Sequence, residues 1–121
     1  MLNILAEEIH KNNIEKGFYD NEKNIGEMLC LIHSEVSEAL EADRKNKYTT
    51  GTIGVINSFV LDEMFITDFT IGVKDTFEDE MADIIIRVLD LCAFKGIDIE
   101  KHIEAKVRYN STREFKHGKK Y

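Results

Sequence analysis

Apolar residues recur at steps of three and four over four stretches of the chain, the period of a helix with one buried face. The clearest stretch runs from about Ile25 to Arg44, and a second starts near Phe77 and ends at Gly96. Weaker patterns predict helices over about residues 2–16 and from Asp98 to about residue 112. The sequence contains no proline to interrupt them, so we expect four long helices.

The segment from Lys45 to Lys74 follows a different pattern. It contains three glycines and many Thr, Ile, Val and Phe residues, and it alternates locally between apolar and polar residues, as in Phe69–Val73. This pattern predicts extended chain or a short hairpin. We therefore expect an all-α, four-helix bundle with a short extended or β-hairpin insertion between helices 2 and 3. Its 121 residues fit a single domain, residues 1–121.

The charge of the chain is unevenly distributed. The formal net charge is -7, yet residues 106–121 hold six Lys or Arg against one acid, a net of +5, which leaves -12 for the first 105 residues. An acidic body repels the backbone of DNA and RNA, so no nucleic-acid polymer is expected as a partner. The distribution suits a small polyphosphate held through a divalent metal on one side and Lys or Arg on the other. Two solvated surfaces would give the same balance.

Cellular location is predicted from three features. No apolar run is long enough to cross a bilayer, and the first residues lack the basic start and cleavage site of a signal peptide. Cys30 and Cys92 both stand among apolar residues at helical spacing, which predicts two reduced cysteines in the core. We expect a cytoplasmic protein with no membrane partner.

Two pairs of acids carry the candidate chemistry. Glu35 and Glu38 are three residues apart on the second predicted helix, and Glu80 and Asp83 are three apart on the third. Residues at that spacing share one side of a helix, so two antiparallel helices would gather four carboxylates. Such a group needs a cation, and oxygen ligands favour Mg²⁺, with Mn²⁺ as a substitute. An acidic chain also produces such pairs by chance on solvent-facing surfaces, but here they lie beside the apolar rows, as in a bundle that lines a site.

Three sequence pieces, in this order, resemble one known family. They are Glu35-Val36-Ser37-Glu38, Glu80-Met81-Ala82-Asp83, and Lys106-x-x-Tyr109-Asn110-x-x-Arg113 followed by His117-Gly118-Lys119-Lys120. They look like the E-x-x-E helix, the E-x-x-D helix and the C-terminal segment of the MazG-like all-α NTP pyrophosphatases. Matching positions cover about residues 25–45 and 75–120. The chain departs from the compact members in the 41 residues that separate Glu38 from Glu80.

The resemblance implies a Mg²⁺-dependent enzyme that cleaves a nucleoside triphosphate between its α and β phosphorus atoms, with nucleotide-pool cleaning as a candidate role. It also implies assembly as a homodimer or homotetramer. It implies metal ligands at Glu35, Glu38, Glu80 and Asp83. It also implies that the phosphates or the sugar contact Lys106, Asn110, Arg113 and Lys119, with Lys120 as a further candidate.

The residue types agree with phosphoryl transfer on chemical grounds, because that reaction needs positioning and neutralisation of charge more than covalent help. A carboxylate not fully used as a ligand can take the proton of the attacking water, and Glu38 is the candidate. The alternative is a non-catalytic helical binding or assembly protein on the same scaffold. Glu7-x-x-His10 fits half of a carboxylate di-iron motif, and we disfavour di-iron chemistry as the function of this chain.

Overall fold

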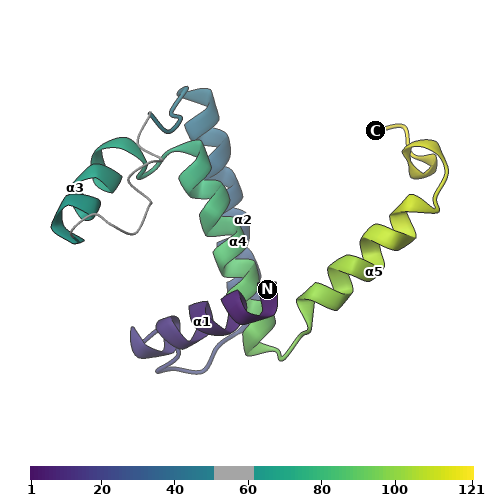
Figure 1. Cartoon of the computed structure of the whole chain (residues 1–121), viewed down its shortest axis with the longest axis horizontal. Helices are drawn as coiled ribbons and strands as arrows, with labels where there is room; N and C mark the ends of the chain where they lie inside the picture. The colour runs from purple at the N-terminus through teal and green to yellow at the C-terminus, as the bar shows by residue number, and fades with distance from the viewer. Residues whose placement is uncertain (51–61) are drawn as a thin grey trace. The chain divides into compact units, whose positions relative to one another are not determined.

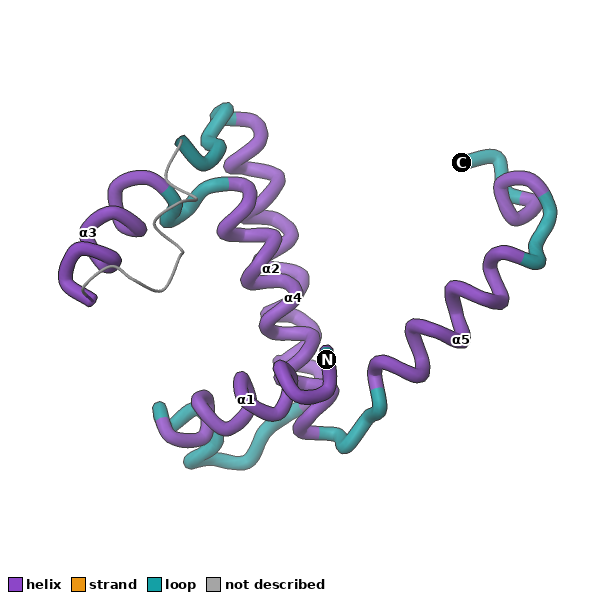
Figure 2. The backbone as a smooth tube through the Cα atoms, viewed as in Figure 1, coloured by secondary structure: helices purple, strands orange, loops and turns teal. Residues whose placement is uncertain are grey.

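The computed structural model describes residues 1–50 and 62–121, which form five α-helices and one short 3₁₀ helix, with no strand among them (Figures 1 and 2). The helices are α1 (Leu2–Glu15), α2 (Ile25–Arg44), α3 (Asp62–Gly72), α4 (Phe77–Phe94) and α5 (Ile99–Ser111), followed by η2 (Phe115–Gly118). The all-α prediction is confirmed, and the expected number of four helices is wrong. None of the described helices is long and apolar enough to cross a membrane.

The chain divides into two compact units, which we describe one at a time. The central unit comprises Glu22–Val88 and therefore holds α2, α3 and most of α4. The terminal unit comprises Met1–Asn21 and Leu89–Tyr121, and so holds α1, the last turns of α4, α5 and η2.

In the central unit, α2 and α4 lie side by side and run antiparallel (Figure 1). Glu35, early in this contact on α2, pairs with Arg87 late on α4, whereas Lys47, just beyond α2, accepts a hydrogen bond from Phe77 at the start of α4. The side chain of Asn24 caps the start of α2 by accepting from the Glu27 amide. The helix pair thus brings the two predicted acid motifs onto neighbouring helices.

The prediction of extended chain is wrong for residues 62–72, which form α3; residues 51–61 lie outside the described part of the chain. Interactions one helical turn apart outweigh the local alternation. The Phe65 and Phe69 rings, one turn apart, lie 5.7 Å from each other and favour the helix. The Thr67 and Thr70 hydroxyls find their acceptors inside the helix, in carbonyls four residues earlier. Asp62 and Glu63 also suit the first turn of a helix.

Asp75 and Glu78 have the spacing of a capping box, but the observed cap of α4 lies one residue after Asp75. Asp75 has a left-handed φ of 61°, and Thr76 takes the capping position, its hydroxyl accepting from the Asp79 amide at 3.3 Å. The predicted helix start near Phe77 is nevertheless confirmed.

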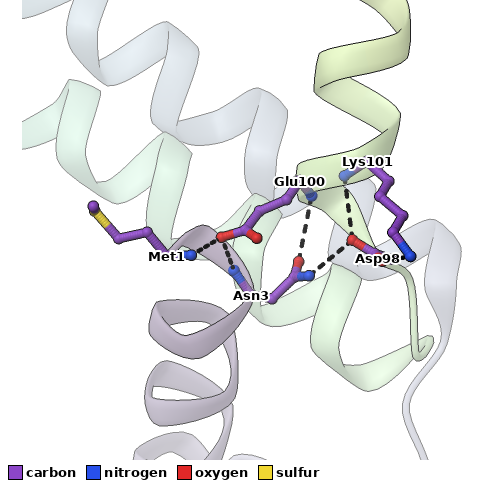
Figure 3. Close-up of polar contacts among 5 residues, drawn as sticks. All are labelled: Met1, Asn3, Asp98, Glu100 and Lys101. Atoms are coloured by element: carbon purple, nitrogen blue, oxygen red, sulfur yellow. Dashed lines mark hydrogen bonds and ion pairs between the residues drawn. The ribbon is translucent and has the colours of Figure 1, made fainter.

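Within the terminal unit, the first residues of the chain fasten the start of α5 (Figure 3). The Asn3 side-chain amide donates to Asp98 at 2.8 Å, and the Asn3 backbone amide and the Met1 amino group both donate to Glu100. Asp98 also caps α5, as predicted, by accepting from the Lys101 amide. Hydrogen bonds lower the pKa of both carboxyl groups. The largest contribution comes from Asn3 for Asp98 and from the Met1 amino group for Glu100.

Many apolar side chains expected in the core are exposed. On α2 the stripe of Leu29, Val36 and Leu40 is about half exposed, as are Met81 and Ile85 on α4. Cys92 is buried but Cys30 is exposed, so the prediction of two core cysteines is wrong for Cys30. The helices have the predicted apolar rows, but one copy of the chain leaves much of those rows uncovered.

Candidate metal centre

Three of the four predicted ligands meet between α2 and α4. Carboxylate oxygens of Glu35, Glu38 and Glu80 all lie within 4.8 Å of one another. The i, i+3 spacing places Glu35 and Glu38 on one side of α2, and the antiparallel packing brings Glu80 opposite them. Glu35 and Glu80 are 6% and 7% exposed, whereas Glu38 is exposed to solvent. This cluster, Glu35, Glu38 and Glu80, could hold a metal ion.

Asp83 follows Glu80 by one helical turn and is half-buried, but it is not part of that cluster. Burial, followed by the negative charges of Asp79 and Glu35, raises the pKa of its carboxyl group. Its service as a ligand stays a prediction.

The cluster is electrostatically strained without a cation. Burial, and then the negative charge of Glu38, raise the pKa of Glu80 to about 7. The hydrogen bond with Glu35 and the charge of that group raise the pKa of Glu38. Neighbouring negative charges and burial favour the protonated form of each carboxyl group. A divalent cation can take the place of those protons and neutralise the charges.

The donor set fits a hard divalent ion. All three groups offer oxygen, the ligand atom that Mg²⁺ and Mn²⁺ prefer. Octahedral Mg²⁺ at about 2.1 Å from its ligands needs ligand oxygens about 3.0 Å apart when adjacent and about 4.2 Å when opposite. A group of oxygens already within 4.8 Å of one another therefore needs only small side-chain adjustments.

Arg87 is a charged neighbour of the cluster that the sequence prediction did not include among the site residues. Its Nε donates to Glu35 Oε1 at 2.5 Å, and its side chain is 40% exposed while that of Glu35 is 8% exposed. Arg87 thereby neutralises one acid of the cluster and fixes its position. The signal was available in the sequence, because Arg87 follows Glu80 by seven residues, two helical turns along the same side of α4.

A hollow of about 290 Å³ adjoins the cluster. Its lining contains two acids of the cluster and two basic residues, and consists of Glu38, Glu41, Ala42, Lys45, Lys47, Asp75 and Glu80.

The candidate substrate contacts of the C-terminal segment belong to the terminal unit, whereas the cluster belongs to the central unit. Lys106 and Arg113 both lie over the ring of Tyr109, with the Lys106 Nζ 5.3 Å and the Arg113 Cζ 5.7 Å from its centroid. The Asn110 side-chain oxygen is buried and has no hydrogen-bond partner among the described residues. Lys119 is exposed and follows η2. Contact of these residues with phosphate or sugar stays a prediction.

The terminal unit contains another buried acid, Asp90, which is 9% exposed. It lies 2.8 Å from His10 Nδ1 and accepts the Tyr19 hydroxyl at 2.7 Å. Tyr19 also packs against the rings of His10 and Phe94. His10, which the sequence offered as half of a di-iron motif, is therefore part of a structural hydrogen-bond network.

No protein-family model, curated protein or solved structure matches the chain significantly. The resemblance to the MazG-like family rests on the three sequence pieces alone.

Proposed function

We propose that the chain is a Mg²⁺-dependent hydrolase that cleaves a nucleoside triphosphate to the monophosphate and pyrophosphate. The observation that carries the proposal is the meeting of Glu35, Glu38 and Glu80 on two antiparallel helices. The type of reaction is proposed from the resemblance of the surrounding sequence to the MazG-like pyrophosphatases.

In this proposal Glu38 and Glu80 are the principal metal ligands, because Arg87 already occupies one oxygen of Glu35. Asp83 would be the further ligand that the resemblance implies. When bound, Mg²⁺ would neutralise charge on the phosphate oxygens and acidify a water molecule. If one oxygen of Glu38 holds the ion, its other oxygen would be suited to accept a proton from that water.

The C-terminal residues Lys106, Asn110, Arg113 and Lys119 are proposed to contact the phosphates or the sugar. Support comes from the sequence resemblance and from the chemistry of the side chains, since guanidinium and ammonium groups both bind phosphate oxygens. The unsatisfied oxygen of Asn110 is an acceptor that a sugar hydroxyl or a base amino group would complete.

We propose that the protein works as a homodimer or homotetramer in the cytoplasm. The exposed stripe of Leu29, Val36 and Leu40 on α2, and Met81 and Ile85 on α4, is apolar surface that a second copy would cover. The same exposed apolar residues favour the second candidate, a non-catalytic assembly protein on this scaffold.

A nucleotide panel separates the two candidates. The full chain is incubated with ribo- and deoxyribonucleoside triphosphates, with Mg²⁺ and with a chelator, and pyrophosphate and orthophosphate are measured. The enzyme proposal expects pyrophosphate from at least one nucleotide, with Mg²⁺ only, and its loss in Glu80→Gln. Glu8→Gln, an exposed acid of α1, removes the same charge and should retain activity. If no nucleotide releases pyrophosphate, the enzyme proposal fails and the assembly protein is the remaining candidate. If orthophosphate is the product instead, the bond that is cleaved is a different one from the proposed α–β bond.

A further inference from the structure

The hollow beside the metal cluster carries both signs of charge. Its lining holds two lysines, Lys45 and Lys47, and four acids, Glu38, Glu41, Asp75 and Glu80. Among residues 1–50 and 62–121, the ion pairs within 4.0 Å include neither of these two lysines. Their ammonium groups are therefore open to an anion that enters the hollow.

The turn after α2 sets the positions of both lysines. Asn46 adopts a left-handed φ of 54°, its amide donates to the Asp43 carbonyl at 2.9 Å, and the Lys47 amide donates to the Ala42 carbonyl at 2.8 Å. This is the Schellman pattern of helix termination, and asparagine is one of the few residues that tolerate the left-handed position. Lys45 and Lys47 thus stand on either side of a defined turn.

The residues after the turn are tied to α4, which carries Glu80. The Lys47 carbonyl accepts from the Phe77 amide at 2.8 Å, and the Thr49 amide donates to Glu78 at 2.9 Å. The Tyr48 and Phe77 rings pack with their centroids 5.3 Å apart. The backbone at the lysines is therefore fixed relative to the acids, which lowers the ordering cost of binding a ligand between them.

The chemistry of the hollow fits a polyphosphate that enters together with a divalent cation. Carboxylates alone would repel phosphate oxygens, whereas ammonium groups in the same hollow attract them. At about 290 Å³ the hollow is at the lower end of the range for sites that hold a whole small ligand, which suits a phosphate chain rather than a complete nucleotide.

We propose that Lys45 and Lys47 bind the polyphosphate chain of the substrate while Glu38 and Glu80 hold its cation. This inference rests on the proposed function, and it adds two phosphate-binding residues in the central unit to the candidates of the C-terminal segment.

The test measures binding and turnover separately. Lys45→Gln and Lys47→Gln are compared with Arg44→Gln, which removes the same charge from the adjacent residue outside the hollow. Calorimetry of the full chain uses Mg²⁺ alone and inorganic tripolyphosphate with Mg²⁺. Each lysine variant should weaken tripolyphosphate binding about 10-fold, the loss of one charge-assisted contact, and should leave Mg²⁺ binding unchanged or tighter because a like charge is removed. Lys→Arg at the same positions should restore most of the affinity.

Tripolyphosphate affinities equal to those of Arg44→Gln would overturn the inference. Weakened Mg²⁺ binding in parallel would overturn it as well, because that result indicates a structural role. If the lysine variants lose tripolyphosphate and yet no nucleotide is hydrolysed, the proposed function fails and the inference stands. If nucleotides are hydrolysed with an unchanged KM in both variants, the inference alone fails.

Discussion

Two buried carboxyl groups of α4, Glu80 and Asp90, have opposite surroundings. Asp90, 9% exposed, faces a histidine nitrogen and a tyrosine hydroxyl. Glu80, 7% exposed, has Glu38, Glu35 and Asp83 as its charged neighbours, and burial together with Glu38 raises its pKa to about 7. Burial alone therefore does not mark a functional acid. An acid surrounded by donors stabilises the fold, whereas an acid surrounded by acids calls for a cation.

Glutamine at the cluster should produce the largest effect. Glu38→Gln and Glu80→Gln each remove a proposed ligand, and we expect pyrophosphate release to fall at least about 100-fold, beyond the usual loss for groups that only support a ligand. Asp90→Asn removes a charge from the other acid and should change the rate per folded molecule by less than about 3-fold, since a surviving acceptor keeps the network. Steady-state kinetics measure both. An equal loss of activity in the cluster variants and in Asp90→Asn would contradict the separate roles given to Glu80 and Asp90.

The pH dependence of stability should separate wild type from Glu80→Gln. The pKa of Glu80 is raised from its ordinary 4.5 to about 7, so the carboxyl group is protonated in both folded and unfolded chains below pH 4.5 and costs nothing there. Between pH 4.5 and about 7 this group is ionised in the unfolded chain but still protonated in the folded chain. Metal-free wild type should therefore lose stability progressively over that window, by roughly 2 to 3 kcal/mol relative to the variant, and the loss should level off above pH 7. Urea unfolding in a chelator at several pH values measures the difference.

Mg²⁺ should remove this pH-dependent loss, because the cation replaces the protons. A stability difference that does not change with pH, or that grows as the pH falls, would contradict the assignment.

Asp90→Ala should destabilise the terminal unit by about 2 kcal/mol, because it leaves the Tyr19 hydroxyl and the His10 ring without their acceptor. The sign is opposite to that expected for Glu80→Gln without metal. Urea unfolding followed by tyrosine fluorescence measures it, with Asp20→Ala, an exposed acid of the same unit, as the control. A stable Asp90→Ala protein would mean that the network contributes little.

Arg87→Gln should produce the smallest effect. Loss of the ion pair with Glu35 leaves one more unpaired acid in the cluster, at a cost of about 1 kcal/mol without metal, since the arginine is partly exposed. Mg²⁺ should then raise the melting temperature of the variant more than that of wild type, because the cation faces one positive charge fewer. Thermal unfolding with and without Mg²⁺ measures this, and a smaller Mg²⁺ effect in the variant would indicate that Arg87 supports the metal rather than competes with it.

The helices and the cluster could be predicted because their causes are local and periodic. Apolar spacing gave α2 its observed bounds, Asp98 gave the start of α5, and the i, i+3 spacing of Glu35 and Glu38 predicted a common direction. Extended chain was predicted over Phe69–Val73 because the alternation was read without the Phe65–Phe69 ring pair, one helical turn apart, that favours α3.

Contacts between distant residues could not be read from the sequence. The partners of Asp90 come from positions 10 and 19, and the pairing of Arg87 with Glu35 spans 52 residues. The hollow depends on the left-handed turn at Asn46, which no apolar pattern reports. The apolar rows of α2 and α4 were predicted correctly as rows, but the degree of their burial depends on what covers them.

The most direct test of the central claim is a calorimetric titration of metal-free protein with Mg²⁺ and Mn²⁺. Wild type and Asp90→Asn should bind the ion saturably with release of protons, since the pKa of Glu80 near 7 leaves that group partly protonated at neutral pH. Glu38→Gln and Glu80→Gln should show at least about 10-fold weaker binding. Absence of saturable binding in wild type, or equal binding in Glu80→Gln, would contradict a metal centre at Glu35, Glu38 and Glu80.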